Sequence, residues 1–203
     1  MPHGTLVDMG SAALQPKMTA AQYIEWLQDQ PIKYQYIDGE VFAMAGGSAR
    51  HAYLCSQASS ALASATRGRS CKAFGSELHL YIPATGNYFF ADASVICGPV
   101  QLHAGSDAAL NPSVVVEVLS PSTEQHDRSG KWHDYQSIPS LQDYLLVEQE
   151  TARVEHYHRT GDGSWRYRVY TTGDRIPLTQ DLEIAVDELY EGAFEIPLRA
   201  DKT

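Results

Sequence analysis

Cysteine, positive charge and long apolar runs are all scarce in this 203-residue chain. The three cysteines, Cys55, Cys71 and Cys97, are odd in number and show no Cys-x-x-Cys spacing. The sequence therefore predicts neither a disulfide framework nor a zinc knuckle, and it fits a reducing cytoplasm. No stretch approaches the roughly 18 consecutive apolar residues of a membrane span, and no basic-then-apolar N-terminal segment indicates a signal peptide. We therefore expect a cytoplasmic protein with no membrane partner.

The excess of negative over positive charge lies mainly in the second half of the chain. Fifteen lysine and arginine residues face 25 aspartate and glutamate residues, a formal net charge of −10. This balance argues against a general nucleic-acid or membrane coat. Residues 1–100, however, carry six basic and seven acidic side chains, whereas residues 101–203 carry nine and 18. The nearly neutral first half permits a local basic face for nucleic acid, for which the candidates are Arg50, Arg67, Arg69 and Lys72.

The chain has enough apolar residues, 43%, to bury a core, and one domain is expected. We place this domain at residues 18–196, between a flexible N-terminal tail at 1–17 and a C-terminal tail at 197–203. Helical and strand-like patterns follow one another along it, with additional antiparallel hairpins. The fold class expected from this order is α/β or α+β.

Local signals predict most of the elements. Thr19–Gln22 matches a capping box that starts a short helix, and Asp38-Gly39 between two strand-like runs predicts a tight hairpin. Apolar residues three or four apart predict a helix from about 50 to 66. Further strands and one helix are expected at 71–74, 78–82, 88–97, 114–119, 123–136 (the helix), 144–147, 153–158 and 165–170. The order strand 114–119, helix, strand 144–147 is typical of a right-handed parallel crossover.

Two apolar strands are each interrupted by a single carboxylate. Glu117 stands within Val114–Leu119, a run typical of a strand buried on both faces, and Asp92 stands within 88–97. A buried carboxylate is costly unless it is protonated, paired with a cation or bound to a metal. Because consecutive strands usually lie side by side, the two acids can share one divalent ion. Mg²⁺ prefers one or two carboxylates, waters and substrate phosphate, and it can activate water for phosphodiester hydrolysis.

Lys131, in the helix after the Glu117 strand, is a candidate cation beside such an ion, where it would stabilise developing negative charge. Two plainer explanations stay open. Asp127 and Lys131 are four residues apart, so they can form an exposed pair worth about 0.3–0.5 kcal/mol. Arginines in the core would explain the two acids nearly as well.

Several motifs in order resemble those of the Uma family of restriction endonuclease-like proteins, over about residues 19–192. The motifs are Val116–Thr123 followed by Asp127-Arg128 and Lys131, the segment Tyr34–Val41, Ala45–Ser48 with Arg50-His51, and Ile82–Tyr88. That family is similar to the PD-(D/E)XK nuclease superfamily, whose core is a mixed central sheet flanked by helices. The resemblance implies Asp92 and Glu117 as ligands of Mg²⁺, for which Mn²⁺ can substitute. The main-chain carbonyl of Val118 is implied as a third ligand.

The sequence departs from the superfamily pattern at two places. The lysine normally stands two residues after the glutamate, where this chain has Leu119, so its role is assigned to Lys131. Relatives also carry a glutamate where this chain has Gln35, a change that keeps the shape and loses a charge. His51 is a further candidate, for contact with the scissile phosphate or a metal-bound water. A solvent-facing Arg50-His51 pair explains these two residues equally well.

Other groups carry less chemistry. His156 and His158 share a strand face at a spacing that can bind a metal, but no third ligand is evident, and an exposed hairpin is the commoner explanation. Two hypotheses remain. The first is a Mg²⁺-dependent endonuclease that cleaves DNA. The second is a catalytically silent nuclease-fold module with a binding or regulatory role. In either case we expect a homodimer, by analogy with the family.

Overall fold

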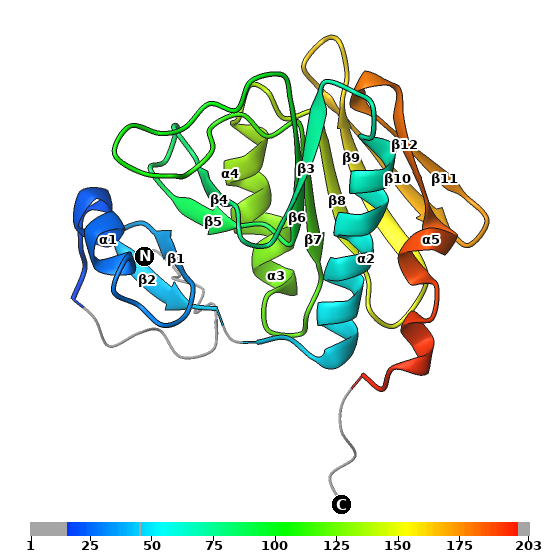
Figure 1. Ribbon diagram of the computed structural model, residues 1–203, viewed down its shortest axis with the longest axis horizontal. Coiled ribbons are helices and arrows are strands. Elements are labelled where there is room, and N and C mark those ends of the chain that lie inside the picture. The colour runs from blue at the N-terminus through cyan, green and yellow to red at the C-terminus, as the bar shows by residue number, and fades with distance from the viewer. Residues whose placement is uncertain (1–15, 45, 199–203) are drawn as a thin grey trace, which may run out of the picture.

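The structure is a computed structural model that describes residues 16–44 and 46–198, and it contains three sheets (Figure 1). The largest sheet has six strands in the order β10-β9-β8-β7-β6-β3. Their bounds, in chain order, are β3 Cys71–Gly75, β6 Ala93–Cys97, β7 Val114–Val118, β8 Asp143–Val147, β9 Arg153–Arg159 and β10 Trp165–Thr171. Only β7 and β8 pair in parallel; the other pairs are antiparallel. The predicted α+β class with a mixed central sheet is confirmed.

Two smaller sheets flank the large one. A four-stranded sheet has the order β2-β1-β5-β4, with β1 Tyr34–Ile37, β2 Glu40–Ala43, β4 His79–Tyr81 and β5 Tyr88–Phe90. β11 Arg175–Leu178 and β12 Leu182–Ala185 form a two-stranded sheet. The predicted hairpin joins β1 to β2, with Asp38 at φ 51° and Gly39 at φ 90°, the positive values that this tight turn requires.

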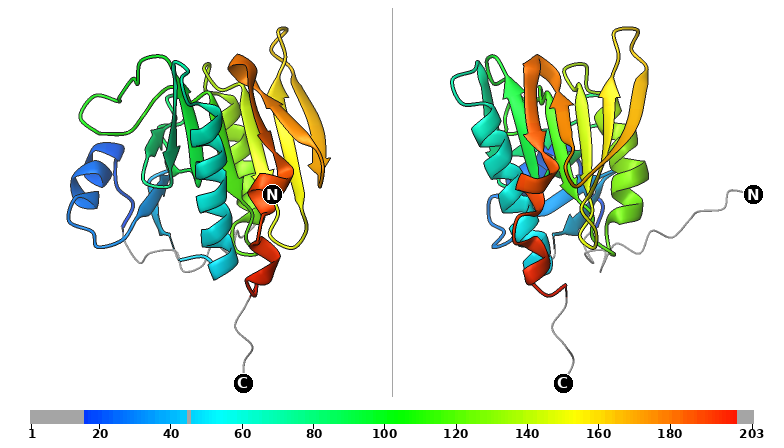
Figure 2. Two further views of the ribbon diagram at one scale, coloured as in Figure 1. Left: turned by 45° about the vertical axis from the view of Figure 1, so that its right-hand side comes forward. Right: turned by 90° about the vertical axis from the view of Figure 1, so that its right-hand side faces the viewer.

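Helices cover both faces of the large sheet (Figure 2). The long helix α2, Ala49–Ala65, lies on one face together with β11, β12 and the short helix α5, Val186–Tyr190. The opposite face is covered by the connection between β7 and β8, which comprises α3 Glu124–His126, a π-helical segment at Asp127–Lys131 and α4 Trp132–Gln136. This connection is the predicted crossover. The N-terminal helix α1, Ala20–Leu27, begins at the predicted capping box of Thr19 and Gln22 and packs beside β1.

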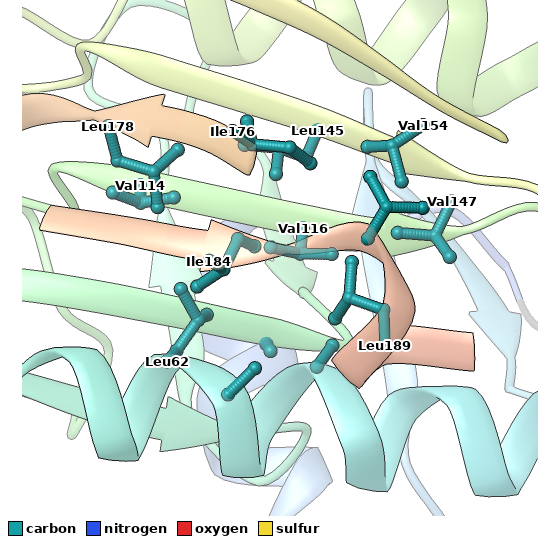
Figure 3. Close-up of a cluster of buried hydrophobic side chains, with 14 of the residues drawn as sticks. Leu62, Val114, Val116, Leu145, Val147, Val154, Ile176, Leu178, Ile184 and Leu189 are labelled. Atoms are coloured by element: carbon teal, nitrogen blue, oxygen red, sulfur yellow. The ribbon is translucent and has the colours of Figure 1, made fainter. Parts of the chain in front are cut away.

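Two separate apolar cores result from this layering. Figure 3 shows the core under α2, where Val114, Val116, Leu145 and Val147 of the sheet meet Leu62 and side chains from β11, β12 and α5. Alternate residues of the same strands, such as Val115 and Leu146, point to the core under α4. Strands buried on both faces read as continuous apolar runs, which is why β7 and β8 have no polar alternation. Any polar side chain in these strands must therefore find a partner inside the protein.

Three predictions need correction. Cys71 and Cys97 form a disulfide, because they are direct partners on the antiparallel strands β3 and β6 with Cα atoms 3.9 Å apart. The apolar run 88–97 is two strands in different sheets, β5 and β6, separated at Ala91-Asp92. The helix expected at 123–136 is interrupted by its π-helical segment.

The predicted domain limits remain predictions, because most of both predicted tails, residues 1–15 and 199–203, lies outside the described residues. Ala45 of the glycine motif also lies outside them. Among the residues described, no helix is both long and apolar enough to cross a membrane.

Candidate active site

Glu117, the fourth of the five residues of β7, is a carboxylate only 2% exposed in a strand that is otherwise apolar. Both of its oxygens are engaged by the connection that covers this face. The Tyr135 hydroxyl donates to Oε1 at 2.9 Å, and Lys131 Nζ lies 3.1 Å from Oε2. Glu117 is therefore held by a cation and a hydroxyl, as a buried acid requires.

Lys131 comes from the π-helical segment, and its amine is buried. The amine lies 2.9 Å from Asp127 Oδ1 as well as beside Glu117, and both Asp127 and Lys131 are at most 3% exposed. The plainer hypothesis, an exposed Asp127–Lys131 pair, is wrong. π-helical turns are rare and occur mostly at functional sites. Gly130 lets the His126 ring pack against this turn, because a Cβ there would lie 2.6 Å from the ring.

Asp92 lies between β5 and β6, one residue before Ala93, which pairs with Val116 on the antiparallel strand β7. Its neighbour across the strands is thus the Glu117–Val118 end of β7. Asp92 Oδ2 accepts a hydrogen bond of 2.7 Å from the Val118 N–H. Adjacent strands therefore bring together two acids that are 25 residues apart in sequence, as predicted.

His51 approaches this strand end from the other side, from the first turn of α2. Its Nε2 lies 3.0 Å from the Val118 carbonyl oxygen and 3.7 Å from Asp92 Oδ2, and its Nδ1 lies 3.4 Å from the Cys55 sulfur. Ser48 starts the helix, accepting a hydrogen bond from the His51 N–H. His51 is thus directed inward, so the solvent-facing explanation does not describe it.

These side chains line one pocket of about 340 Å³. Gln35 of β1 lies on its wall and is only 7% exposed. Its Oε1 is buried and finds no hydrogen-bond partner among the described residues. Since buried oxygens without a partner are rare, this oxygen is available to a ligand in the pocket. The residues that the structure brings together here are Gln35, His51, Asp92, Glu117, Val118 and Lys131.

The pocket carries more negative than positive charge. Burial raises the pKa of Glu117 to about 8, although Lys131 opposes the shift. Burial alone would lower the pKa of Lys131, but Asp127 and Glu117 more than offset this and raise it above its usual range, so the amine stays charged. Burial and Asp92 raise the pKa of the Cys55 thiol well above its usual range, which keeps the thiol neutral. One lysine thus faces three acids, Asp92, Glu117 and Asp127.

The predicted basic face lies elsewhere. Arg50 donates to the carbonyl oxygens of Ile196 and Gln149 at 2.8 and 3.0 Å, and its guanidinium stacks on Phe194. The other three basic residues, Arg67, Arg69 and Lys72, follow the C-terminal end of α2 at Ala65, which lies about 21 Å along the helix from His51 at 1.5 Å per residue. None of the four lines the pocket, and their role in binding nucleic acid stays a prediction.

Asp127 and Tyr135 belong to this site and were not predicted as parts of it. Asp127 has a signal in the sequence, its four-residue spacing from Lys131, but that spacing does not say which way the pair points. Tyr135 is one more turn along the same connection, and its hydroxyl contact with Glu117 depends on how the helix folds back on the sheet.

The chain is similar in sequence to known proteins over most of its length. Residues 20–189 match the model of the Uma2 family, described as "Putative restriction endonuclease". The chain belongs to the Uma2 family. An uncharacterized Synechocystis protein, slr1290, is 38% identical over 87% of this chain and 93% of its own. A second, sll1609, is 37% identical over 73% of this chain and 84% of its own.

The fold has a solved counterpart. The crystal structure of "a putative nuclease belonging to DUF820" from Anabaena variabilis superposes with a TM-score of 0.69, covering 87% of this chain and 99% of that one. At 17% identity this likeness concerns the fold alone. The Uma2 resemblance predicted from the motifs is confirmed, and the fold is nuclease-like.

The pocket of this Uma2 protein has the donors that a hard divalent cation needs. Carboxylate and carbonyl oxygens are the ligands that Mg²⁺ prefers, and Asp92, Glu117 and the Val118 carbonyl offer them along one strand end. The surplus of acids over Lys131 and the unpartnered Gln35 oxygen both fit a cation with its waters. The residues present therefore fit Mg²⁺.

Proposed function

We propose that this Uma2 protein is a Mg²⁺-dependent endonuclease that hydrolyses DNA phosphodiester bonds. The observation that carries the proposal is the convergence of Asp92, Glu117 and the buried amine of Lys131 on one pocket. Membership of a family described as a restriction endonuclease supports the same reaction class.

Each residue has a role that follows from its contacts. Mg²⁺ held by Asp92, Glu117 and the Val118 carbonyl would polarise a phosphodiester oxygen and lower the pKa of a water. Lys131, kept charged by Asp127, supplies a fixed positive charge where the phosphate becomes more negative in the transition state. Because the amine is buried, water screens this charge little.

Two further groups position the ligands. Tyr135 holds Glu117 through its hydroxyl, so that the carboxylate keeps its orientation. His51, beside both the Val118 carbonyl and Asp92, lies where it can donate to a phosphate oxygen. Gln35 offers an amide where relatives carry a carboxylate, so it would bind water or phosphate as a neutral group.

Cleavage of supercoiled plasmid with Mg²⁺ or Mn²⁺ tests the proposal. We expect the parent to nick or linearise the plasmid, and Asp92→Ala and Lys131→Ala each to slow this by about 10²-fold or more. Matched controls are Asp29→Ala and Lys17→Ala, an exposed acid and an exposed lysine whose loss should leave the rate unchanged. If the parent cleaves no DNA or RNA of varied sequence, or if the site variants cleave as fast as the controls, these residues are not catalytic.

Calorimetric titration with Mg²⁺ separates binding from turnover. We expect the parent to bind Mg²⁺ and Glu117→Gln to lose the signal. Binding without any cleavage would instead support a silent nuclease-fold module, which the neutral Gln35 also favours.

A further inference from the structure

We propose a second metal site, formed by Asp143, His156 and His158, for a borderline divalent transition ion such as Zn²⁺. One carboxylate oxygen and one ring nitrogen of each histidine lie within 4.8 Å of one another. The site goes beyond the nuclease function, since none of these residues lines the pocket of Asp92 and Glu117. The two histidines share a strand face, as the sequence predicted, and the third ligand comes from the neighbouring strand.

Strand register explains why the three side chains converge. Asp143 of β8 is the direct partner of His158 on β9, and His156 lies two residues further along the same face. Asp143 is fully buried and His156 is 3% exposed. His156 Nε2 and His158 Nδ1 lie 2.8 and 2.7 Å from the same atom, Asp143 Oδ1. The expected exposed hairpin is therefore wrong at this end of β9.

The donor set matches zinc better than magnesium. Two imidazole nitrogens and one carboxylate oxygen are a common three-ligand set for Zn²⁺, whereas Mg²⁺ is bound mainly by oxygen. A neutral imidazole carries one ring proton, so binding through these nitrogens only moves that proton to the other ring nitrogen. The ion would replace the two hydrogen bonds that Asp143 Oδ1 accepts from the histidine rings.

The surroundings hold the carboxylate in place and leave one side open. Asp143 Oδ2 accepts a 2.7 Å hydrogen bond from the Thr179 N–H, the kind of outer contact that orients metal ligands. The two histidines line a pocket of about 210 Å³ with Arg166, Arg168 and Tyr170. These two arginines form no ion pair with any residue in the described part of the chain, so a fourth, exchangeable ligand on this side would be an anion.

The proposed site is separated from the candidate active site by the sheet. Asp143, Leu145 and Val147 alternate along β8 and so share a face, the one under α2 that Figure 3 shows. Glu117, in contrast, contacts Tyr135 and Lys131 on the opposite face. An ion at Asp143 would join β8, β9 and the end of β11, which ends at Leu178 beside Thr179.

Co²⁺ is the probe, because a tetrahedral site with histidine ligands gives it an intense visible spectrum. All proteins carry Cys55→Ser, which removes the thiol of the other mixed donor group, His51, Cys55 and Asp92. We expect one Co²⁺ to bind with a tetrahedral spectrum and Zn²⁺ to displace it. Loss of a residue that only orients a metal ligand typically weakens binding by roughly 10–100-fold. Because His158 is proposed as a ligand itself, His158→Gln should weaken binding by at least this much. His133→Gln, at an exposed histidine, is the control and should bind as the parent does.

Stability is a second readout. At about 100 times its dissociation constant, Zn²⁺ should raise the melting temperature by roughly 5–10 °C in the parent, and not in His158→Gln. Mg²⁺ titration should be unchanged by His158→Gln. A missing tetrahedral spectrum, or one that survives in His158→Gln, overturns the proposal. So does stabilisation by inorganic phosphate instead of Zn²⁺, lost in Arg168→Ala, which would make the pocket an anion site.

Discussion

Charged side chains of the π-helical segment Asp127–Lys131 point both into the protein and outward. The inner and outer groups of ion pairs differ in their ratio of positive to negative charges. Inward, the Lys131 amine meets Asp127 and Glu117 with a side chain 4% exposed. Outward, Arg128 is 29% exposed and joins a partly exposed network with Glu124, Glu148, Arg153 and the buried Glu155. The outer network has two arginines for three glutamates. The inner one has a single lysine for three acids once Asp92 is counted.

The difference supports the proposal that the inner group, and not the outer one, binds a metal ion. Where charges are exposed, water screens them. An unpaired charge there therefore lowers stability little, and each ion pair raises stability little. The two arginines outweigh burial and lower the pKa of Glu155, so this network is satisfied as it stands. In the interior an unbalanced carboxylate is costly, and the pKa of Glu117 is raised. This difference is why we propose a divalent cation for the inner group and none for the outer group.

Removing the cation from each group gives the largest expected contrast. Lys131→Met leaves buried acids without their partner, so it should lower the free energy of unfolding by about 3–5 kcal/mol. Arg128→Met removes partly exposed pairs and leaves the buried Glu155 paired with Arg153, so it should cost less, about 1 kcal/mol. Urea denaturation at pH 8 without divalent ions measures both. Equal losses would mean that burial does not separate the two groups.

The pH dependence of stability should come from the inner group. Glu117 has a raised pKa in the folded protein, so between about pH 5 and 8 the folded state holds a proton that the unfolded state has lost. Stability due to Glu117 is then complete below its unfolded pKa and falls as pH rises, by about 1.4 kcal/mol per unit. Urea denaturation at several pH values in a chelator measures the slope. Glu117→Gln should flatten it; an unchanged slope would assign the effect to other groups.

Adding a negative charge to the pocket should strengthen the binding of Mg²⁺ by the inner group. Gln35→Glu places a fourth acid at the pocket wall, and because ligand charge tunes affinity, Mg²⁺ should bind about tenfold more tightly. The control, Gln101→Glu, adds the same charge in an exposed loop and should change little. Calorimetric titration gives both affinities. Unchanged or weaker binding in Gln35→Glu would show that the amide does not face the ion.

Salt should produce the smallest effect and should act on the outer group alone. Raising NaCl from about 0.05 to about 0.5 M shortens the Debye length and screens exposed charges. The cost of Arg128→Met should therefore shrink by a few tenths of a kcal/mol, while the cost of Lys131→Met stays the same. Repeating the denaturation series at the two salt concentrations tests this. A salt-sensitive Lys131→Met would mean that water reaches the amine.

Signals confined to a few neighbouring residues could be predicted from the sequence. The capping box of Thr19 and the Asp38-Gly39 turn each depend on a local backbone conformation, and both are present. The parallel pairing of β7 with β8 followed from the order of elements. Asp92 and Glu117 could be placed together because consecutive strands usually pair.

Features that depend on distant partners could not be predicted in this way. The Cys71–Cys97 disulfide requires the β3–β6 register, and the convergence of Asp143 with His156 and His158 requires the β8–β9 register. A run of apolar residues also hides the break at Asp92, because β5 and β6 look alike in sequence although they belong to different sheets. No local signal predicts the π-helical turn at Asp127–Lys131, because a glycine inside a helical pattern, here Gly130, is compatible with an ordinary helix.

The central claim is that the inner acids hold a divalent ion. A crystal soaked in Mn²⁺, measured for anomalous scattering, tests it most directly. We expect a peak in contact with the carboxylates of Asp92 and Glu117, with the Lys131 amine nearby. A clean map without a peak there, in crystals whose Lys131 and Glu117 side chains remain paired, would contradict it.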